Sequence, residues 1–180
     1  MMEKEKLKNI LKIIIIILCV IMFIGLFLPY EKSIDEHRKY LEKNPNTMNI
    51  KEVNITNKDA IDISMIENFK VYSYVMNNSN DDSWLAGEST INFVLTIIIM
   101  VSIGLVLLFT LLNKRILSII FDILLLISSI MMNTDIVSRG VIPSSKYTYG
   151  ISYYLFPIIS IIILISIIIL MIKNRKQKNK

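Results

Sequence analysis

Four long apolar segments dominate this sequence and restrict how the chain can fold. They run over Ile10–Leu28, Ile91–Leu112, Ile116–Met132 and Ile151–Ile172. Because an α-helix rises about 1.5 Å per residue, each segment reaches or approaches the roughly 30 Å of hydrocarbon in a bilayer. We therefore expect an all-α integral membrane protein with four transmembrane helices, at residues 10–29, 91–112, 116–132 and 151–172.

Basic residues beside these segments predict the orientation of the chain, because Lys and Arg close to a span resist transfer across the membrane. They gather in the tail 1–9, the turn 113–115 and the tail 173–180. We therefore expect both termini in the cytoplasm, and residues 30–90 and 133–150 outside. These span ends account for the net charge of +5. They carry no interleaved aromatic residues, so nucleic acid is not an expected partner.

Asp122 is an acidic residue inside an expected span. A charged side chain at the bilayer centre costs about 2.5–3.5 kcal/mol on insertion scales, so the carboxylate should face protein or water. Three interpretations remain open. Asp122 is a structural carboxylate paired with Lys12 or Arg115, a proton- or cation-coupling residue of a transporter, or a docking point for a membrane partner.

Residues 30–90 are too long for a turn and too charged for a span, and we expect them to form a small, mostly helical extracytoplasmic domain. Apolar spacing predicts amphipathic helices over 30–43 and 62–76, the second lying on the membrane surface. A strand over 71–75 is the alternative to the second helix. Rough alternation over Met48–Ile55 allows a short strand, and turn residues occupy 77–83.

Motifs for chemistry are absent from the sequence. His37 is the only histidine and has no second imidazole or thiolate nearby, so we expect a solvated helix face rather than a zinc site. The acidic turn that begins at Asn78 lacks the Gly and Glu that a calcium loop requires. No phosphate loop, nucleophile elbow or HExxH helix occurs. We therefore expect no metal, no cofactor and no enzymatic activity.

Aromatic residues flank the expected spans on their outer side. Trp84 precedes the second span, and the start of the fourth carries Tyr147, Tyr149, Tyr153 and Tyr154. Trp and Tyr concentrate at the headgroup level of membranes, which is the simpler explanation. The alternative is an outward groove in which these rings form a platform for an apolar peptide, a lipid or a partner domain.

Several short stretches of the sequence resemble stretches found in known membrane proteins. They are Phe27-Leu28-Pro29-Tyr30 after the first span, Gly87 before the second, the inner turn with Lys114 and Arg115, and the stretch Tyr149-Gly150-Ile-Ser-Tyr153-Tyr154-Leu155. With the span plan, they resemble uncharacterised four-span membrane proteins of Gram-positive bacteria. The resemblance implies a bacterial cytoplasmic membrane and no particular activity. The order of loops is also similar to that of claudins and tetraspanins, but their paired loop cysteines are missing.

Two classes of function fit these features. The first is a structural or accessory membrane protein that binds a partner through its extracytoplasmic loop, with a membrane protein or a second copy of the chain as that partner. The second is a small oligomeric transporter or channel in which Asp122 couples protons or cations, since four spans alone rarely enclose a pathway.

Overall fold

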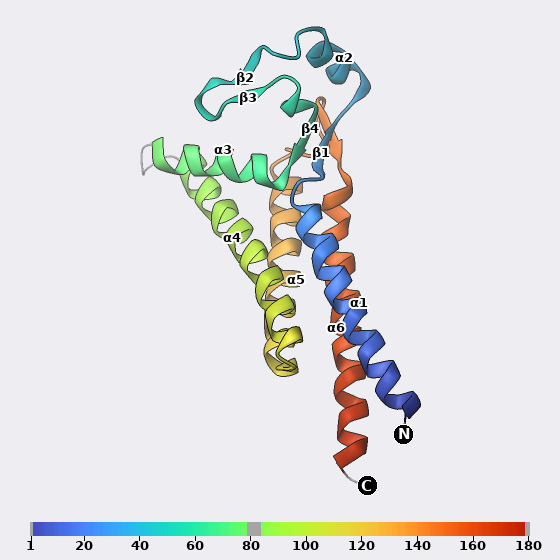
Figure 1. Ribbon diagram of the computed structural model, residues 1–180. Helices are drawn as coiled ribbons and strands as arrows, with labels where there is room; N and C mark the ends of the chain where they lie inside the picture. Colours follow the sequence, from blue (N-terminus) through green and yellow to red (C-terminus); the bar gives the residue numbers. More distant parts are fainter. Residues whose placement is uncertain (1, 79–83, 179–180) are drawn as a thin grey trace.

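The computed structural model describes residues 2–78 and 84–178. Four long helices form a bundle: α1 (Met2–Gly25), α4 (Trp84–Leu111), α5 (Arg115–Ser138) and α6 (Ile151–Lys178). Each is long and apolar enough to cross a membrane, over Leu7–Gly25, Ser89–Leu111, Arg115–Ser138 and Ile151–Ile172. The predicted plan of four membrane-spanning helices is confirmed. Both termini lie at one end of the bundle (Figure 1), which we call the terminal end.

Each helix of the bundle packs against two others. α4 contacts α1 and α5, and α6 contacts the same two helices. Ile15, Ile99 and Ile163 are fully buried in the interior, and large apolar side chains such as Ile120 and Ile161 are exposed on the outside. Only 17% to 39% of each span is buried, so most of its apolar surface is available to lipid.

The turn between α4 and α5 is a helix stop that the sequence encodes locally. Asn113 adopts a left-handed backbone conformation with φ of 57°. Its N–H donates to the Thr110 carbonyl at 3.2 Å, and the Lys114 N–H donates to the Phe109 carbonyl at 2.8 Å. This pairing is the Schellman motif, in which Asn is the usual substitute for Gly.

α5 extends beyond the predicted end of the third span at Met132. It continues to Ser138 because Met132 and Ile136, one turn apart, are both fully buried and keep its apolar face in the bundle. Asp135 also forms an i,i+4 ion pair with Arg139 just past the helix end. Residues 133–138 therefore belong to the helix rather than to a loop.

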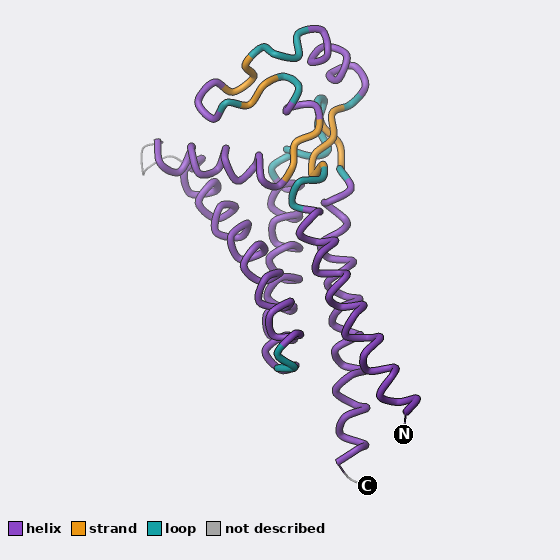
Figure 2. The backbone as a smooth tube through the Cα atoms, viewed as in Figure 1, coloured by secondary structure: helices purple, strands orange, loops and turns teal. Residues whose placement is uncertain are grey.

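A three-stranded antiparallel sheet sits at the end of the bundle opposite the termini (Figure 2). β1 (Pro29–Ser33) is central, between β4 (Asp62–Ser64) and β5 (Tyr147–Tyr149). The predicted helix over 30–43 is therefore wrong in its first part, and only α2 (Asp35–Lys43) is helical. Pairing with two distant strands overrides the local helical spacing of the β1 residues.

The predicted helix over 62–76 is confirmed from Met65 on as α3 (Met65–Asn78), which excludes the strand over 71–75. The first three residues of the predicted helix, 62–64, are instead the strand β4, which pairs with β1. A capping box starts α3. The Ser64 N–H donates to Glu67 Oε2 at 2.6 Å, and the Glu67 N–H donates to Ser64 Oγ at 3.3 Å. Of the predicted turn over 77–83, residues 77 and 78 are helical and residues 79–83 lie outside the described part of the chain.

The Met48–Ile55 region is a hairpin rather than one strand. β2 (Met48–Ile50) pairs with β3 (Ile55–Thr56) across the 3-10 helix η1 (Lys51–Val53), and η2 (Asp59–Ile61) follows. Leu41, Ile55 and Ala60 form a small second core that also packs on Val71 of α3. We call residues 29–78 together with β5 the cap domain. Within it, α3 runs across the bundle beneath the hairpin (Figure 1).

Gly150 marks the closest approach between the cap domain and the spans. Its N–H donates to the Tyr30 carbonyl at 3.0 Å. A Cβ at this position would overlap the carbonyl group of Pro29.

We predict that Gly150→Ala lowers the midpoint of thermal unfolding in detergent micelles, because such overpacking costs about 1–3 kcal/mol. The matched control is Gly104→Ala within α4, where a Cβ would make only an ordinary contact with the Phe23 ring at 3.9 Å. Equal midpoints for the two variants would contradict the close packing described at Gly150.

Candidate functional site

A partly buried carboxylate joins α4 and α5 at the bundle end that carries the cap domain. Asp135 Oδ2 accepts hydrogen bonds from Asn92 Nδ2 at 2.6 Å and from Arg139 Nε at 2.9 Å. Arg139 Nη2 lies 2.6 Å from the same oxygen. Asn92 is fully buried, and the Arg139 and Asp135 side chains are only 19% and 27% exposed. The pair is therefore shielded from much of the solvent that weakens surface ion pairs.

The cap domain reaches this carboxylate through Arg139. The guanidinium group also donates to the Tyr72 hydroxyl of α3 and lies close enough to Glu31 of β1 to affect its ionisation. Glu31 is 4% exposed, and its Oε1 accepts a hydrogen bond from Asn68 Nδ2 of α3 at 2.8 Å. We call these residues the interface network: Glu31, Asn68, Tyr72, Asn92, Asp135 and Arg139.

A second connection lies beside the network and ties β1 to α5 and α6. The Tyr30 hydroxyl donates to Asn133 Oδ1 at 2.5 Å, and Asn133 Nδ2 donates to the Tyr153 carbonyl at 3.0 Å. The Ser152 hydroxyl donates to the Gly25 carbonyl at 2.7 Å, which satisfies a terminal carbonyl of α1. All four spans therefore meet the cap domain or one another through buried polar contacts.

Burial raises the pKa of the cap-domain side chains at this junction, Tyr30, Glu31 and Tyr72. It raises the pKa of Glu31 above its ordinary value, and the Asn68 hydrogen bond and the Arg139 charge oppose that shift only in part. Burial also raises the pKa of the Tyr30 and Tyr72 hydroxyls, so both stay protonated at neutral pH. The arrangement can hold two folded parts together, because most of its polar groups bond one another across the junction, although Asn92 Oδ1 has no hydrogen-bond partner among the described residues.

The tyrosines singled out in the sequence do come together, but they mostly face the protein. Tyr149 and Tyr153 have ring centroids 4.7 Å apart, and the Tyr147 hydroxyl donates to the Ala60 carbonyl at 2.8 Å. Burial and the nearby Glu31 charge raise the pKa of Tyr147 to about 12. Tyr154 is 49% exposed. The Trp84 side chain lies outside the described residues.

His37 does not lie on a freely solvated helix face as predicted. Its ring makes an edge contact with Tyr147, at a centroid distance of 5.2 Å, and stacks on Tyr40 at 6.2 Å. Burial and the Lys146 charge lower the pKa of His37. The sequence gives no sign of this contact because the segment carrying Tyr147 follows more than a hundred residues later in the chain.

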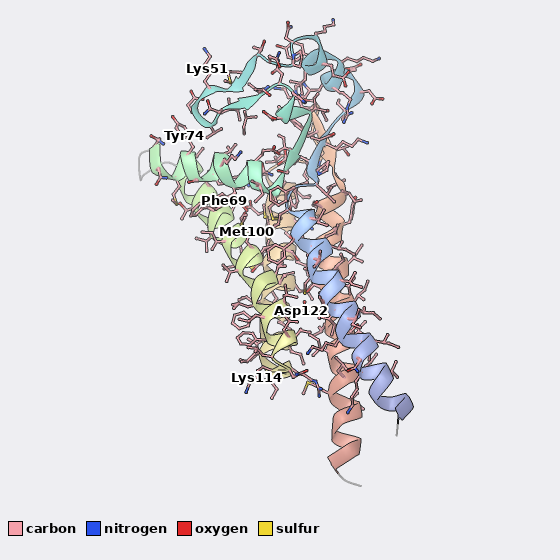
Figure 3. All side chains as sticks on the ribbon, in the orientation of Figure 1. Lys51, Phe69, Tyr74, Met100, Lys114 and Asp122 are labelled. Carbon is pink, nitrogen blue, oxygen red and sulfur yellow. The ribbon has the colours of Figure 1, made fainter. Side chains whose placement is uncertain are left out.

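Asp122 is fully buried in the middle of the bundle (Figure 3). Its Oδ1 accepts a hydrogen bond from the Ser160 hydroxyl of α6 at 2.9 Å, and its Oδ2 has no hydrogen-bond partner among the described residues. Below it, a cavity of about 280 Å³ at the terminal end reaches Ser118, one helical turn away. Above it, the buried side chains of Leu125 and Met132 fill the interior.

Neither basic residue proposed as a partner forms an ion pair with Asp122. Lys12 Nζ donates instead to the Leu111 carbonyl at 3.0 Å and to Asn113 Oδ1 at 3.3 Å. A cation is favourable there because Leu111 ends α4, where terminal carbonyls lack partners. Arg115 forms no salt bridge with any described residue and lines the cavity instead.

The interface network was not predicted from the sequence. Asp135 and Arg139 were placed in a loop, although their i,i+4 spacing was a usable signal for a helix that continues. Asn92 lies within the second apolar segment, where a polar residue is unusual enough to be noticed. Nothing local distinguishes Glu31 from the exposed carboxylates near it, because its burial depends on α3.

We predict that Glu31→Gln stabilises the protein at neutral pH. The folded-state pKa of Glu31 is raised, so folding favours the protonated form. The contribution of Glu31 to stability is therefore fully present below 4.5, the ordinary pKa of a glutamate, and is lost as pH rises through the raised pKa of the folded state. The gain in unfolding midpoint over wild type should be largest at pH 8 and shrink towards pH 4.5. Glu52→Gln, at an exposed position, is the control, and a gain that does not change with pH would refute the assignment.

No protein-family model matches this chain, and comparison with curated proteins and with solved structures gives no match.

Proposed function

We propose that this chain is a structural or accessory protein of the bacterial cell membrane, which binds a partner through its cap domain. The observation that carries the proposal is the interface network. It fixes the cap domain to the spans through α3, α4, α5 and β1, so that the outer surface is held at a defined position relative to the membrane. A fixed surface suits recognition, because little conformational freedom is lost on binding.

The orientation proposed here places the cap domain outside the cytoplasm and both termini inside. The tails and the turn between α4 and α5 share the terminal end of the bundle, and they carry basic residues such as Lys8, Lys114 and Arg115. That distribution supports a cytoplasmic terminal end by the positive-inside rule.

The surface that we assign to the partner is the outer layer of the cap domain. Tyr40 on α2 is 66% exposed and Met48 on β2 is 44% exposed, whereas Tyr147, Tyr149 and Tyr153 are partly buried by internal contacts. Exposed aromatic side chains surrounded by charged residues are typical anchors of protein interfaces. The partner is therefore another protein, either a membrane protein with an external domain or a second copy of this chain. We propose no catalytic role.

We predict that a specific protein co-purifies with the tagged wild type from its native membrane in mild detergent, and that Tyr40→Ala/Met48→Ala reduces its recovery at least tenfold. Mass spectrometry of the eluate identifies that protein, and native mass shows whether it is a second copy. The control is Tyr74→Ala on α3, which removes a ring that is 37% exposed. Identical eluates from wild type and the double variant would contradict the proposal.

A second candidate function is a small oligomeric transporter or channel with Asp122 as its coupling residue. The observation that favours it is the unpaired Oδ2 of a fully buried carboxylate one turn above a cavity. Such groups are rare within membranes and mark ion pathways in many proteins. Since Leu125 and Met132 fill the interior above Asp122, a pathway would require rearrangement or a second copy.

For this candidate, we predict that Asp122→Asn unfolds at the same temperature as wild type but abolishes proton-driven flux in proteoliposomes. Ser160→Ala, which removes the hydroxyl donor to Asp122, should leave flux measurable and shift its pH dependence. If wild type shows no flux and Asp122→Asn instead lowers the unfolding midpoint, the carboxylate is structural and the accessory function stands alone.

A further inference from the structure

We propose that the cavity at the terminal end binds a phosphate group, either in the headgroup of an anionic phospholipid or as free inorganic phosphate. Its volume of about 280 Å³ lies near the roughly 300 Å³ lower end of ligand pockets. This site is independent of the cap domain and of the partner assigned to it. It lies at the opposite end of the bundle.

The charge of the cavity wall points to an anion. Lys8, Lys12 and Arg115 all line it, and no acidic residue is among the described side chains that line it. All three side chains are partly buried, which reduces their contact with solvent. An anion bound among these three positive charges would be favoured, because it would lie close to all of them.

Neutral hydrogen-bond donors complete the wall. Thr110 and Ser118 line the cavity with their hydroxyl oxygens 3.4 Å apart, and the side chains of Asn9 and Asn113 are also present. α5 begins in this wall at Arg115, and its N-cap residue Lys114 provides no side-chain cap. The first-turn N–H groups of α5 therefore add positive potential of the kind that attracts phosphate.

The remaining wall is apolar. Ile15, Ile167 and Leu170 line the cavity and belong to the part of α1 and α6 that spans the membrane. A phospholipid would place its phosphate among the cations and its acyl chains outside the cavity, because these three residues are buried in the bundle interior. Lys12 is already held by the Leu111 carbonyl and Asn113, so one cation is positioned before any ligand arrives.

The test uses delipidated full-length protein in a non-ionic detergent. We titrate it separately with short-chain phosphatidylglycerol, short-chain phosphatidylcholine and inorganic phosphate, and follow native mass and the unfolding midpoint. We expect Arg115→Gln to weaken binding about fivefold, the effect of about one basic residue at an anionic surface. The matched control is Lys114→Gln, which removes the same charge from the neighbouring residue that does not line the cavity. Lys8→Gln is the second test variant and should act like Arg115→Gln.

The site is assigned to a lipid headgroup if the protein binds phosphatidylglycerol in preference to phosphatidylcholine, and if Arg115→Gln and Lys8→Gln weaken that binding whereas Lys114→Gln does not. The site is assigned to free phosphate if inorganic phosphate raises the unfolding midpoint to saturation, if no lipid adduct appears in the native mass, and if the three variants have the same effects as above. If phosphatidylcholine binds as well as phosphatidylglycerol, or if all three variants behave alike, the proposal is overturned. If Arg115→Gln fails to fold, the wild-type titration and a comparison of ligand binding by Lys8→Gln and Lys114→Gln test the proposal instead.

Discussion

The carboxylate of Asp135 and the guanidinium of Arg139 form the charged contact at the junction between the cap domain and the spans. One oxygen of Asp135 accepts from both Asn92 and Arg139, and Arg139 continues to Tyr72 and the neighbourhood of Glu31. Removing one partner of a fully buried pair typically costs about 3–5 kcal/mol, because the other charge is left uncompensated. The Arg139 and Asp135 side chains are 19% and 27% exposed, so the cost of removing either one is smaller, and this contact is one of several that attach the cap domain.

The central strand of the cap domain adds a backbone component to the same junction. β1 pairs with β4 from the first loop and with β5 from the second, so the sheet ties segments that are distant in the chain to the start of α6. The core is also continuous across the junction, since Tyr30, Met65 and Tyr72 belong to the same buried cluster as the bundle interior. No cross-link is needed for this attachment. Cys19 is the only cysteine and lies buried within α1.

The sequence predicted what local physics controls and missed what depends on distant partners. Apolar length identified the four spans, and helical spacing identified α3, because each signal is contained within one segment. The helical spacing of the β1 residues predicts a helix instead of a strand, because the pairing of β1 with β4 and β5 involves residues far away in the chain. Asp122 is expected to face protein or water and is fully buried, but its hydrogen-bond partner is Ser160 rather than Lys12 or Arg115. Lys12 and Arg115 lie at the bundle end, where one caps α4 and both line a cavity.

Hydrogen exchange of the purified protein in detergent, compared between wild type and Arg139→Ala, tests most directly whether the interface network fixes the cap domain to the spans. We predict that amides of β1 and α3 lose protection together, while those at the centre of α6 do not change. Arg38→Ala is the control, because it breaks the more exposed ion pair with Asp62, whose side chains are 31% and 35% exposed. Loss of protection confined to the last turn of α5 would contradict the account, because the cap domain would then be held without Arg139.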